Sequence, residues 1–215
     1  MRHILTALSL ALLASHAIAA PFQNGSFESG TLANTGSFDT LSAGSTAITG
    51  WTVTGDGVDY MGTAWVAANG ARSIDLLACG TAGGVQQTFD TLPGAIYQVT
   101  FSLAGNPDGG IKTLTASAAA STANFTFDTA GATTSSMNYA SQSFTFTATS
   151  TSTTLAFSGG VLGGGSSCAG SVLDNVGVSM LVAPSTPIPV GGALGGFAIL
   201  AAFGAYALRR RAKQS

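Results

Sequence analysis

The alternation of apolar and polar residues with a period of two is the feature that most constrains what this chain can fold into. In residues 97–103 every second residue is large and apolar, and the residues between them are Gln98, Thr100 and Ser102. The same spacing recurs in three shorter segments, 125–127, 144–146 and 155–157. Because successive side chains of a β-strand point to opposite faces, the pattern predicts strands with one buried face and one face in water.

Further strands are predicted in six segments, 47–54, 57–61, 72–77, 84–89, 112–118 and 171–180. Turn residues separate the strands, as in Gly55-Asp56-Gly57, Pro93-Gly94 and Asn106-Pro107-Asp108-Gly109-Gly110. No segment in this middle part of the chain has a sustained helical period. About ten short strands of this kind are typical of a two-sheet antiparallel sandwich or jelly roll, so we expect an all-β domain.

The two ends of the chain differ from the middle. Residues 1–20 combine a basic start, an apolar run and a small-residue cleavage motif, which predicts a signal peptide. Residues 190–208 carry no charge and are followed by a basic tail at 209–215, which predicts a transmembrane helix whose basic end stays in the cytoplasm. We therefore expect residues 21–183 to be an exported domain at the cell envelope or cell surface, with a linker at 184–189.

The end of the chain also resembles a known class of sorting signal. Thr186-Pro187-Ile188-Pro189-Val190, the apolar run and the arginine cluster at 209–211 are together similar to PEP-CTERM signals. The resemblance implies that an exosortase, a membrane protease-transpeptidase, removes the helix and releases the domain to the extracellular matrix. A plain membrane anchor is the alternative, because an apolar span with flanking charge does not report cleavage.

The expected exported part is acidic. It holds all nine Asp and Glu residues of the chain against two cations, Arg72 and Lys112, which gives a net charge of −7. Such a domain lacks the basic surface that binds nucleic acid or anionic lipid, so we expect no nucleic-acid partner.

Both histidines, His3 and His16, lie in the predicted signal peptide, so the exported part has none. This excludes Ser–His and Cys–His nucleophiles and the usual histidine-containing zinc sites. A glycosidase acid and base would have to come from residues such as Asp56, Asp59 and Asp75, but two of these flank a turn where Asp is common. We therefore assign no catalytic residue and do not expect an enzyme.

Cys79 and Cys168 are the two cysteines of the chain. Exported proteins fold in an oxidising compartment, where a cysteine pair forms a disulfide more often than a metal site or a reactive thiol. We therefore predict a disulfide between Cys79 and Cys168.

Five motifs occur in the order seen in a known domain family: Asn24-Gly25-Ser26-Phe27-Glu28, Ile48-Thr49-Gly50-Trp51-Thr52-Val53, Arg72-Ser73-Ile74-Asp75-Leu76, Leu103-Ala104-Gly105-Asn106-Pro107-Asp108-Gly109-Gly110 and Leu173-Asp174-Asn175-Val176. Together they resemble the bacterial choice-of-anchor C domain, which is similar to a plant cell-wall family of unknown function with a galactose-binding-like jelly roll. The resemblance implies an exported β-sandwich joined to interchangeable anchors, without an established catalytic activity.

Glu28 and Asp174 are the candidate metal ligands. Asp174 has the same parity as Val172, Val176 and Val178, so it would share a buried face with them, which is costly for an unpaired carboxylate. A structural calcium ion held by both carboxylates and by backbone carbonyls would offset that cost, and carbohydrate-binding modules of galactose-binding-like fold look similar in this respect. Alternatively, both carboxylates accept backbone N–H groups at the rim of the sandwich. A melting temperature that neither EDTA nor calcium changes would dismiss the metal.

The candidate ligand-binding residues are two aromatic rings, Tyr60 and Trp65, and two amides, Asn69 and Asn106. Exposed flat rings can stack on sugar rings, and neutral amides suit hydroxyl groups. Because Tyr60 and Trp65 flank a turn at 62–63, we expect them to form an exposed platform, with burial in the end of the sandwich as the alternative. Trp51 lies within a predicted strand, so we expect it in the core.

These expectations describe a non-catalytic, surface-anchored module that binds polysaccharide or extracellular matrix by stacking and neutral hydrogen bonds. The alternative is a structural or adhesion protein whose Thr- and Ser-rich strands contact other proteins without a defined glycan. Saturable glycan binding distinguishes the two.

Overall fold

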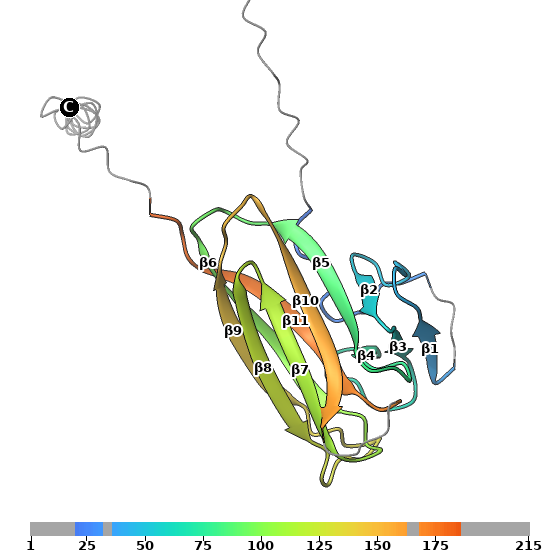
Figure 1. The fold of residues 1–215 in the computed structure, drawn as a ribbon. Helices are drawn as coiled ribbons and strands as arrows, with labels where there is room; N and C mark the ends of the chain where they lie inside the picture. The colour runs from blue at the N-terminus through green and yellow to red at the C-terminus, as the bar shows by residue number, and fades with distance from the viewer. Residues whose placement is uncertain (1–19, 32–35, 163–167, 186–215) are drawn as a thin grey trace, which may run out of the picture. The chain divides into compact units, whose positions relative to one another are not determined.

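A computed structural model describes residues 20–31, 36–162 and 168–185 (Figure 1). The predicted signal peptide, the sorting motif, the apolar segment at 190–208 and the basic tail lie outside the described residues. Within those residues, no helix is long and apolar enough to cross a membrane.

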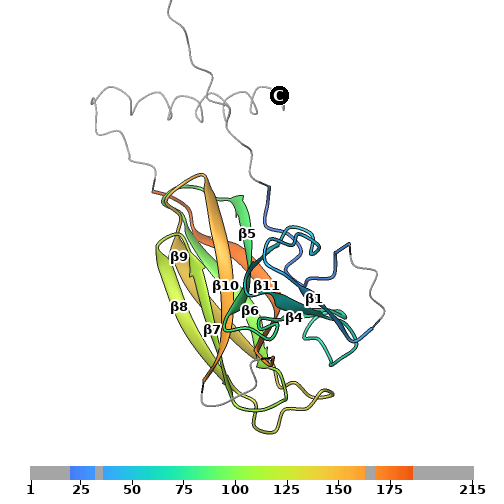
Figure 2. The same ribbon diagram turned by 45° about the vertical axis from the view of Figure 1, so that its right-hand side comes forward.

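The described residues contain eleven β-strands: β1 (Phe38–Leu41), β2 (Thr52–Gly55), β3 (Val58–Met61), β4 (Ser73–Asp75), β5 (Gly83–Asp90), β6 (Ile96–Gly105), β7 (Ile111–Ala118), β8 (Ser121–Asp128), β9 (Ala140–Thr147), β10 (Ser152–Leu162) and β11 (Ser171–Val182). They form a six-stranded sheet in the order β1-β3-β4-β11-β6-β9 and a five-stranded sheet in the order β2-β5-β10-β7-β8. All the pairings are antiparallel. The two sheets face each other as two layers (Figure 2).

The chain changes sheet at almost every step from β4 onward. β5, β7, β8 and β10 lie in one sheet and β4, β6, β9 and β11 in the other, so the hairpin of β7 and β8 is the one connection within a sheet among these eight strands. This winding is that of a jelly roll. The all-β class and the two-sheet antiparallel sandwich predicted from the sequence are therefore confirmed.

The core lies between the sheets and follows the predicted alternation. In β6 the residues Tyr97, Val99, Phe101 and Leu103 are buried, while Thr100 between them is exposed. Trp51 is 1% exposed and its ring packs against three phenylalanines, Phe22, Phe27 and Phe157. The prediction that Trp51 belongs to the core is confirmed.

Two strand predictions need correction. The strand expected at 47–54 begins only at Thr52, because Gly50 has a φ of 82° and the Trp51 N–H donates to Ile48 in a turn (3.0 Å). The strand β1 was not predicted from the sequence, since its four residues show no clear alternation and Phe38 at its start is 47% exposed.

The last strand contains a β-bulge that the sequence pattern did not predict. Asp174 pairs with Ser102 but Gly177 pairs with Thr100, and Asn175 between them has a φ of 51°. The bulge reverses the alternation, so Val176 lies in the main core while Val172 belongs to a smaller apolar cluster. The expectation that Val172, Asp174, Val176 and Val178 share one face is therefore wrong, although Asp174 is fully buried.

The predicted disulfide between Cys79 and Cys168 is confirmed. It joins the segment after β4 to the segment before β11, where two backbone groups hold buried charges. The Ala169 carbonyl accepts a hydrogen bond from Nζ of the buried Lys112 (2.6 Å), and the Gly170 N–H donates to Asp75 (2.9 Å). The disulfide therefore anchors the segment on which both charged side chains depend.

Candidate functional site

The outer face of the six-stranded sheet has a covered part and an open part. The covered part is a small second core of Met61, Trp65, Ala104, Met137 and Val172. The second core contains residues from β3, β6 and β11 and from the segments that follow β3 and β8. The open part of this outer face lies over β6, β9 and the bulge of β11, and it is where a ligand can reach the sheet.

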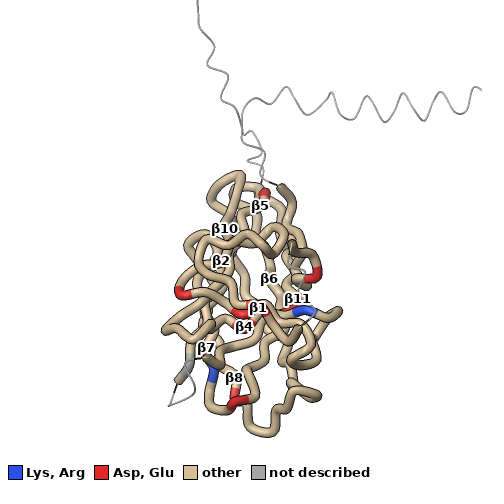
Figure 3. The backbone as a smooth tube through the Cα atoms, turned by 90° about the vertical axis from the view of Figure 1, so that its right-hand side faces the viewer, with Lys and Arg blue, Asp and Glu red and all other residues tan. Residues whose placement is uncertain are grey.

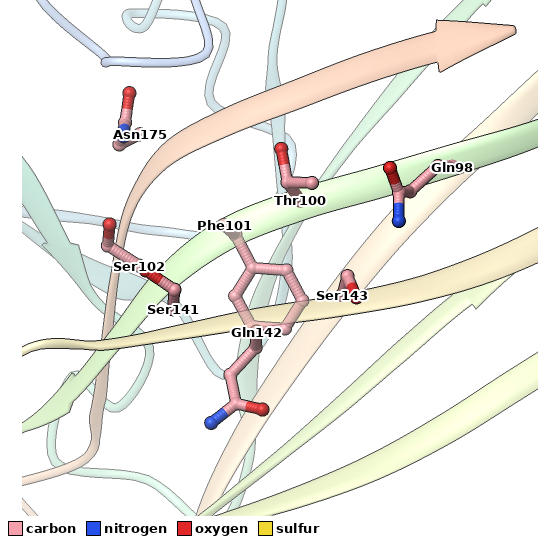
Figure 4. A pocket seen from close by; sticks show the side chains of 8 residues that line it. All are labelled: Gln98, Thr100, Phe101, Ser102, Ser141, Gln142, Ser143 and Asn175. Atoms are coloured by element: carbon pink, nitrogen blue, oxygen red, sulfur yellow. The ribbon is translucent and has the colours of Figure 1, made fainter. Parts of the chain in front are cut away.

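The open part forms a depression of about 360 Å³. Its lining is uncharged and is rich in amide and hydroxyl groups: Gln98, Thr100, Phe101, Ser102, Ser141, Gln142, Ser143 and Asn175. We call this surface the groove. Figure 4 shows that Thr100 and Ser102 of β6 point to the side opposite the Phe101 ring, which faces the core. The register places Ser102 opposite Ser141 and Thr100 opposite Ser143, so β6 and β9 contribute paired hydroxyl groups.

The loop at 68–72 borders the groove. Asn69 Nδ2 donates to Asn175 Oδ1 (3.1 Å), and Asn175 lines the groove. The backbone N–H of Asn69 donates to Asp174 Oδ2 (2.8 Å). The N–H groups of Ala71 and Arg72 both donate to Glu28 Oε1 (2.9 and 2.8 Å). Asn69, which was predicted as a ligand-binding residue, therefore lies at the groove, and Glu28 and Asp174 hold the loop that carries it.

Glu28 and Asp174 both accept hydrogen bonds from backbone N–H groups, which is the arrangement given above as the alternative to calcium binding. Burial raises the pKa of Asp174 to about 6, and the charge of Glu28 raises it further. Hydrogen bonds from the N–H groups of Asn69, Asn175 and Ala68 lower the pKa and offset part of this rise. Two carboxylates are chemically suitable for calcium, which takes six to eight oxygen ligands. However, no group of three or more His, Cys, Asp or Glu residues gathers as a metal site in the described part of the chain. Calcium at Glu28 and Asp174 stays a prediction.

The prediction that Tyr60 and Trp65 form an exposed aromatic platform is wrong. Tyr60 is 1% exposed and Trp65 is 9% exposed. Tyr60 pairs with Ile74 and belongs to the core between the sheets, where its hydroxyl donates to the Phe27 carbonyl. Trp65 lies in the second core, and its Nε1 donates to Ser73 Oγ (3.0 Å). Both rings are therefore buried, Tyr60 in the main core and Trp65 in the second core, and neither is available for stacking at the groove.

A second pocket, of about 300 Å³, adjoins the second core, because Met61 and Trp65 line it. Trp65 and the predicted ligand-binding residue Asn106 both line it, together with Asp59 and Asp75. Asp75 Oδ2 accepts a hydrogen bond from Asn106 Nδ2 (2.8 Å), and its Oδ1 accepts one from the Leu77 N–H (3.1 Å). We call this the acidic pocket. The four predicted ligand-binding residues are thus divided between the core, the groove and the acidic pocket.

The three aspartates considered for catalysis do not all come together. Asp59 and Asp75 are register partners on β3 and β4. Asp56 instead accepts hydrogen bonds from the Thr81 and Ala82 N–H groups (2.7 and 3.3 Å), and these lower its pKa. Its role is that of a turn cap.

The burial of Asp75 predicts an unusual dependence of stability on pH. Burial raises the pKa of Asp75 to about 7, and the neighbouring charge of Asp59 adds to the rise. In the unfolded chain the carboxyl loses its proton near 3.8, whereas the folded protein keeps it until about pH 7. The stabilising contribution is therefore fully present below the unfolded pKa and is lost as the pH rises through the folded pKa, at a cost of roughly 4 kcal/mol at most.

We expect the melting temperature to be higher at pH 5 than at pH 8, and Asp75→Asn to reduce this difference. Calorimetry of the wild type, Asp75→Asn and the surface control Asp90→Asn at both pH values tests this. An Asp75→Asn protein with the same pH dependence as the other two would contradict it.

The groove residues were missed as a site by the sequence analysis. Gln98, Thr100 and Ser102 were recognised as the polar face of a strand, but a polar face is common on any sheet. The signal that identifies a groove is the pairing of this face with Ser141 and Ser143, about forty residues later in the chain. That pairing is not visible in local spacing.

Comparisons with solved structures give likenesses of low identity. A family 61 carbohydrate-binding module in complex with β-1,4-galactotriose is 18% identical, with a TM-score of 0.47, and the match covers 75% of this chain and 98% of that one. A CBM22 xylan-binding domain from Paenibacillus barcinonensis is 16% identical, with a TM-score of 0.43, over 68% of this chain and 97% of that one. A CBM35 from the same organism is 19% identical, with a TM-score of 0.43, over 66% and 98%. At TM-scores below 0.5 these likenesses carry no information on a ligand of this chain.

A sequence match and a family model complete the comparisons. Over 87 residues the chain is 39% identical to halomucin from Haloquadratum walsbyi (strain DSM 16790 / HBSQ001), which is 39% of this chain and 1% of halomucin. The model of the DUF642 family, described as "Protein of unknown function (DUF642)", matches residues 20–179, which is nearly the whole sandwich. The chain therefore belongs to the DUF642 family.

Proposed function

We propose that this protein is a non-catalytic module that binds a neutral polysaccharide in the groove on the outer face of β6, β9 and β11. The observation that carries the proposal is the lining of the groove. On the outer face it combines the side-chain amides of Gln98 and Asn175 with four hydroxyl groups, and no charged residue lines the groove. Such groups can both donate and accept hydrogen bonds, as the hydroxyl groups of a sugar require.

The support of the groove also suits binding rather than chemistry. Its polar side chains stand on neighbouring strands whose opposite face packs into the core, so they are held in place before a ligand arrives. The lining contains no His, Cys, Asp, Glu, Lys or Arg that could serve as a nucleophile, acid or base. Residues 21–183 carry a net charge of −7, which disfavours an anionic polymer. A neutral glycan remains as the ligand class that fits.

The proposed mechanism differs from the one expected from the sequence. Both tryptophans are buried, so hydrogen bonds rather than stacking must supply the affinity of the groove. Neutral hydrogen bonds contribute about 0.5–1.5 kcal/mol each, which predicts modest affinity for a single site. A surface-bound or repeated polymer would compensate, because several sites then bind one chain.

We also propose, from the sequence alone, that the domain is displayed outside the cell and held by the segment at 190–208 or released by an exosortase. The basic start of the predicted signal peptide, the uncharged segment at 190–208 and the basic tail at 209–215 support this proposal. Detection of the domain on intact cells by an antibody tests it. A signal that requires cell lysis would contradict it.

Alanine substitutions in the groove test the binding function. We expect Gln98→Ala and Ser143→Ala each to weaken binding about two- to twelvefold, as the loss of one neutral hydrogen bond predicts. The measurement is affinity electrophoresis of the purified full-length protein in gels that contain single polysaccharides, with Thr126→Ala on the far sheet as the matched control. Binding that survives the double groove variant unchanged would contradict the assignment. Saturable binding to proteins but to no glycan would favour the structural role.

A further inference from the structure

The groove is closed at one end. On the outer face of β6, Thr100 and Ser102 line the groove, whereas Ala104, the next residue of that face, is fully buried in the second core. On β9 the exposed Ser141 lies opposite Ser102, and Tyr139, two residues earlier in the chain, packs against the second core. The second core therefore closes the groove just beyond Ser102 and Ser141.

The loop at 68–72 completes this closed end. Asn175, which lines the groove, accepts a hydrogen bond from Asn69 Nδ2 of the loop (3.1 Å). Backbone N–H groups of the loop donate to the carboxylates of Asp174 and Glu28, so the loop is held by two separate segments. The closed end is therefore in place before a ligand arrives.

The other end of the groove is open. Gln98 lies opposite Ser179 of β11 and Thr145 of β9, and both of these neighbours are exposed. Thr147, the next residue on the outer face of β9, is also exposed. Figure 4 shows Gln98 and Asn175 toward opposite ends of the groove. A ligand chain can therefore leave the groove beside Gln98, whereas the second core stops it at the other end.

The strands of the groove are uncharged along their whole length. β6 and β9 contain no Asp, Glu, Lys or Arg. In Figure 3 the acidic positions gather around β1 and β4. At the rise of a β-strand, the stretch from Gln98 to Ser102 is about 13 Å long, which a short oligosaccharide fills. The groove therefore suits a neutral sugar chain that enters from one side.

We propose that the groove recognises the terminal sugar of a neutral polysaccharide, with the last ring against Ser102, Ser141 and Asn175 at the closed end. This inference rests on the proposed glycan-binding function. A terminal ring has a free hydroxyl group where an interior ring has a glycosidic bond, and the hydroxyl and amide groups of the closed end can bind it. A branched polysaccharide presents many ends, so it also supplies the repeated sites that a modest affinity requires.

A length series distinguishes terminal from interior sugars. The probes are β-1,4-galactan, β-1,3-glucan and dextran, each as trisaccharide, hexasaccharide and linear polymer, titrated into the purified full-length protein by calorimetry. We expect the dissociation constant per chain to agree within about twofold across the three lengths of the probe that binds, because each chain has one terminal sugar of the kind recognised. Interior recognition predicts an affinity per chain that rises with the number of sugars. A polymer that binds more than tenfold tighter per chain than its hexasaccharide would overturn the proposal.

Chemical changes at the two ends of the hexasaccharide identify the sugar that binds. Reduction to the alditol opens the ring at the reducing end, and a methyl ether blocks a hydroxyl group of the non-reducing terminal ring. We expect one of these changes to weaken binding at least tenfold and the other to leave it unchanged. Loss on reduction identifies the reducing end, and loss on methylation identifies the non-reducing end. The same affinity after both changes, or equal loss after both, would overturn the proposal.

Variants at the two ends of the groove provide a second test. Asn175 has a φ of 51°, which glycine adopts readily, so Asn175→Gly removes the side chain and keeps the backbone. Ser141→Ala removes a hydroxyl group of the closed end and leaves the loop contact intact. We expect each to weaken trisaccharide and polymer binding by the same factor, about two- to twelvefold, as the loss of one neutral hydrogen bond predicts. Thr147→Ala, beyond the open end, should bind the trisaccharide as the wild type does.

Thermal melting establishes that the three variants are folded. Folded Asn175→Gly and Ser141→Ala proteins that both bind the trisaccharide normally would contradict the placement of the terminal ring. The two proposals fail in different ways. Saturable binding that grows with chain length would keep the groove as a glycan site and reject recognition of the terminal sugar. The absence of saturable binding to every probe would reject the glycan-binding function, and recognition of the terminal sugar with it.

Discussion

Replacing Cys79 and Cys168 together by serine is expected to lower the free energy of unfolding by about 4–5 kcal/mol. The two residues are 89 positions apart, and on the chain-entropy model a disulfide that closes a loop of this length stabilises mainly by restricting the unfolded chain. The native state also loses an anchor for Ala169 and Gly170, which hold Lys112 and Asp75. Urea unfolding of the double-serine variant measures the effect.

Reduction of the wild-type protein is the natural control for this variant. Dithiothreitol should lower the unfolding midpoint of the wild type to that of the double-serine protein and should leave the double-serine protein unchanged. A variant that unfolds within 1 kcal/mol of the oxidised wild type would contradict the account, because it would mean that the disulfide constrains a part of the chain that is already ordered without it.

Trp51→Ala is expected to lower the free energy of unfolding by about 3–5 kcal/mol. The side chain is 1% exposed, and its ring packs against Phe22, Phe27 and Phe157 at centroid distances of 5.8, 5.2 and 6.4 Å. Its Nε1 also donates to the Asn24 carbonyl (2.9 Å), so the substitution leaves that carbonyl without its partner. The expected loss combines a large cavity with a missing hydrogen bond.

Val66→Ala is the matched surface control, because Val66 is 58% exposed. It should change the free energy of unfolding by no more than about 0.5 kcal/mol. Denaturant titration of both variants provides the comparison. A Trp51→Ala protein as stable as Val66→Ala would show that the aromatic cluster is not the centre of the core.

The alternating segments were predictable because a two-residue period follows directly from strand geometry. Val99, Phe101 and Leu103 face the core as expected, and so does Phe157. Where the backbone departs from regular geometry, the prediction fails. The bulge at Asn175 shifts the register of β11, and its local signals, an asparagine that tolerates a positive φ and a glycine at 177, are weaker than the alternation of the valines around them.

The site was harder to predict because it depends on which strands become neighbours. Tyr60 and Trp65 were chosen for their position beside a turn, yet the whole of β3 is buried since the segments after β3 and β8 cover its outer face. Thr100 and Ser143 become neighbours in one surface only when β6 and β9 pair. Glu28 and Asp174 both contact the loop at 68–72, which their positions in the sequence did not indicate, and calcium at this pair stays a prediction.

The motif at 24–28, although distant in the sequence from the strands of the groove, contacts both β11 and the loop that borders the groove. The Val176 N–H donates to the Gly25 carbonyl (2.8 Å), and a Cβ atom at Gly25 would lie 1.8 Å from the Val176 carbonyl oxygen. A glycine is therefore required for this close approach of the backbones. Three residues later, Glu28 accepts the N–H groups of the loop that borders the groove. The motif thus links the first described segment to the proposed binding face.

A pair of blocking variants tests the central claim most directly. Ser143→Trp places a bulky ring in the groove, and Ser158→Trp places the same ring at an exposed position of β10 on the outer face of the other sheet. The measurement is the dissociation constant of each folded variant for a neutral polysaccharide that the wild type binds. We predict that Ser143→Trp weakens binding at least tenfold while Ser158→Trp binds as the wild type does. Loss of binding in Ser158→Trp with normal binding in Ser143→Trp would contradict the assignment and move the binding surface to the five-stranded sheet.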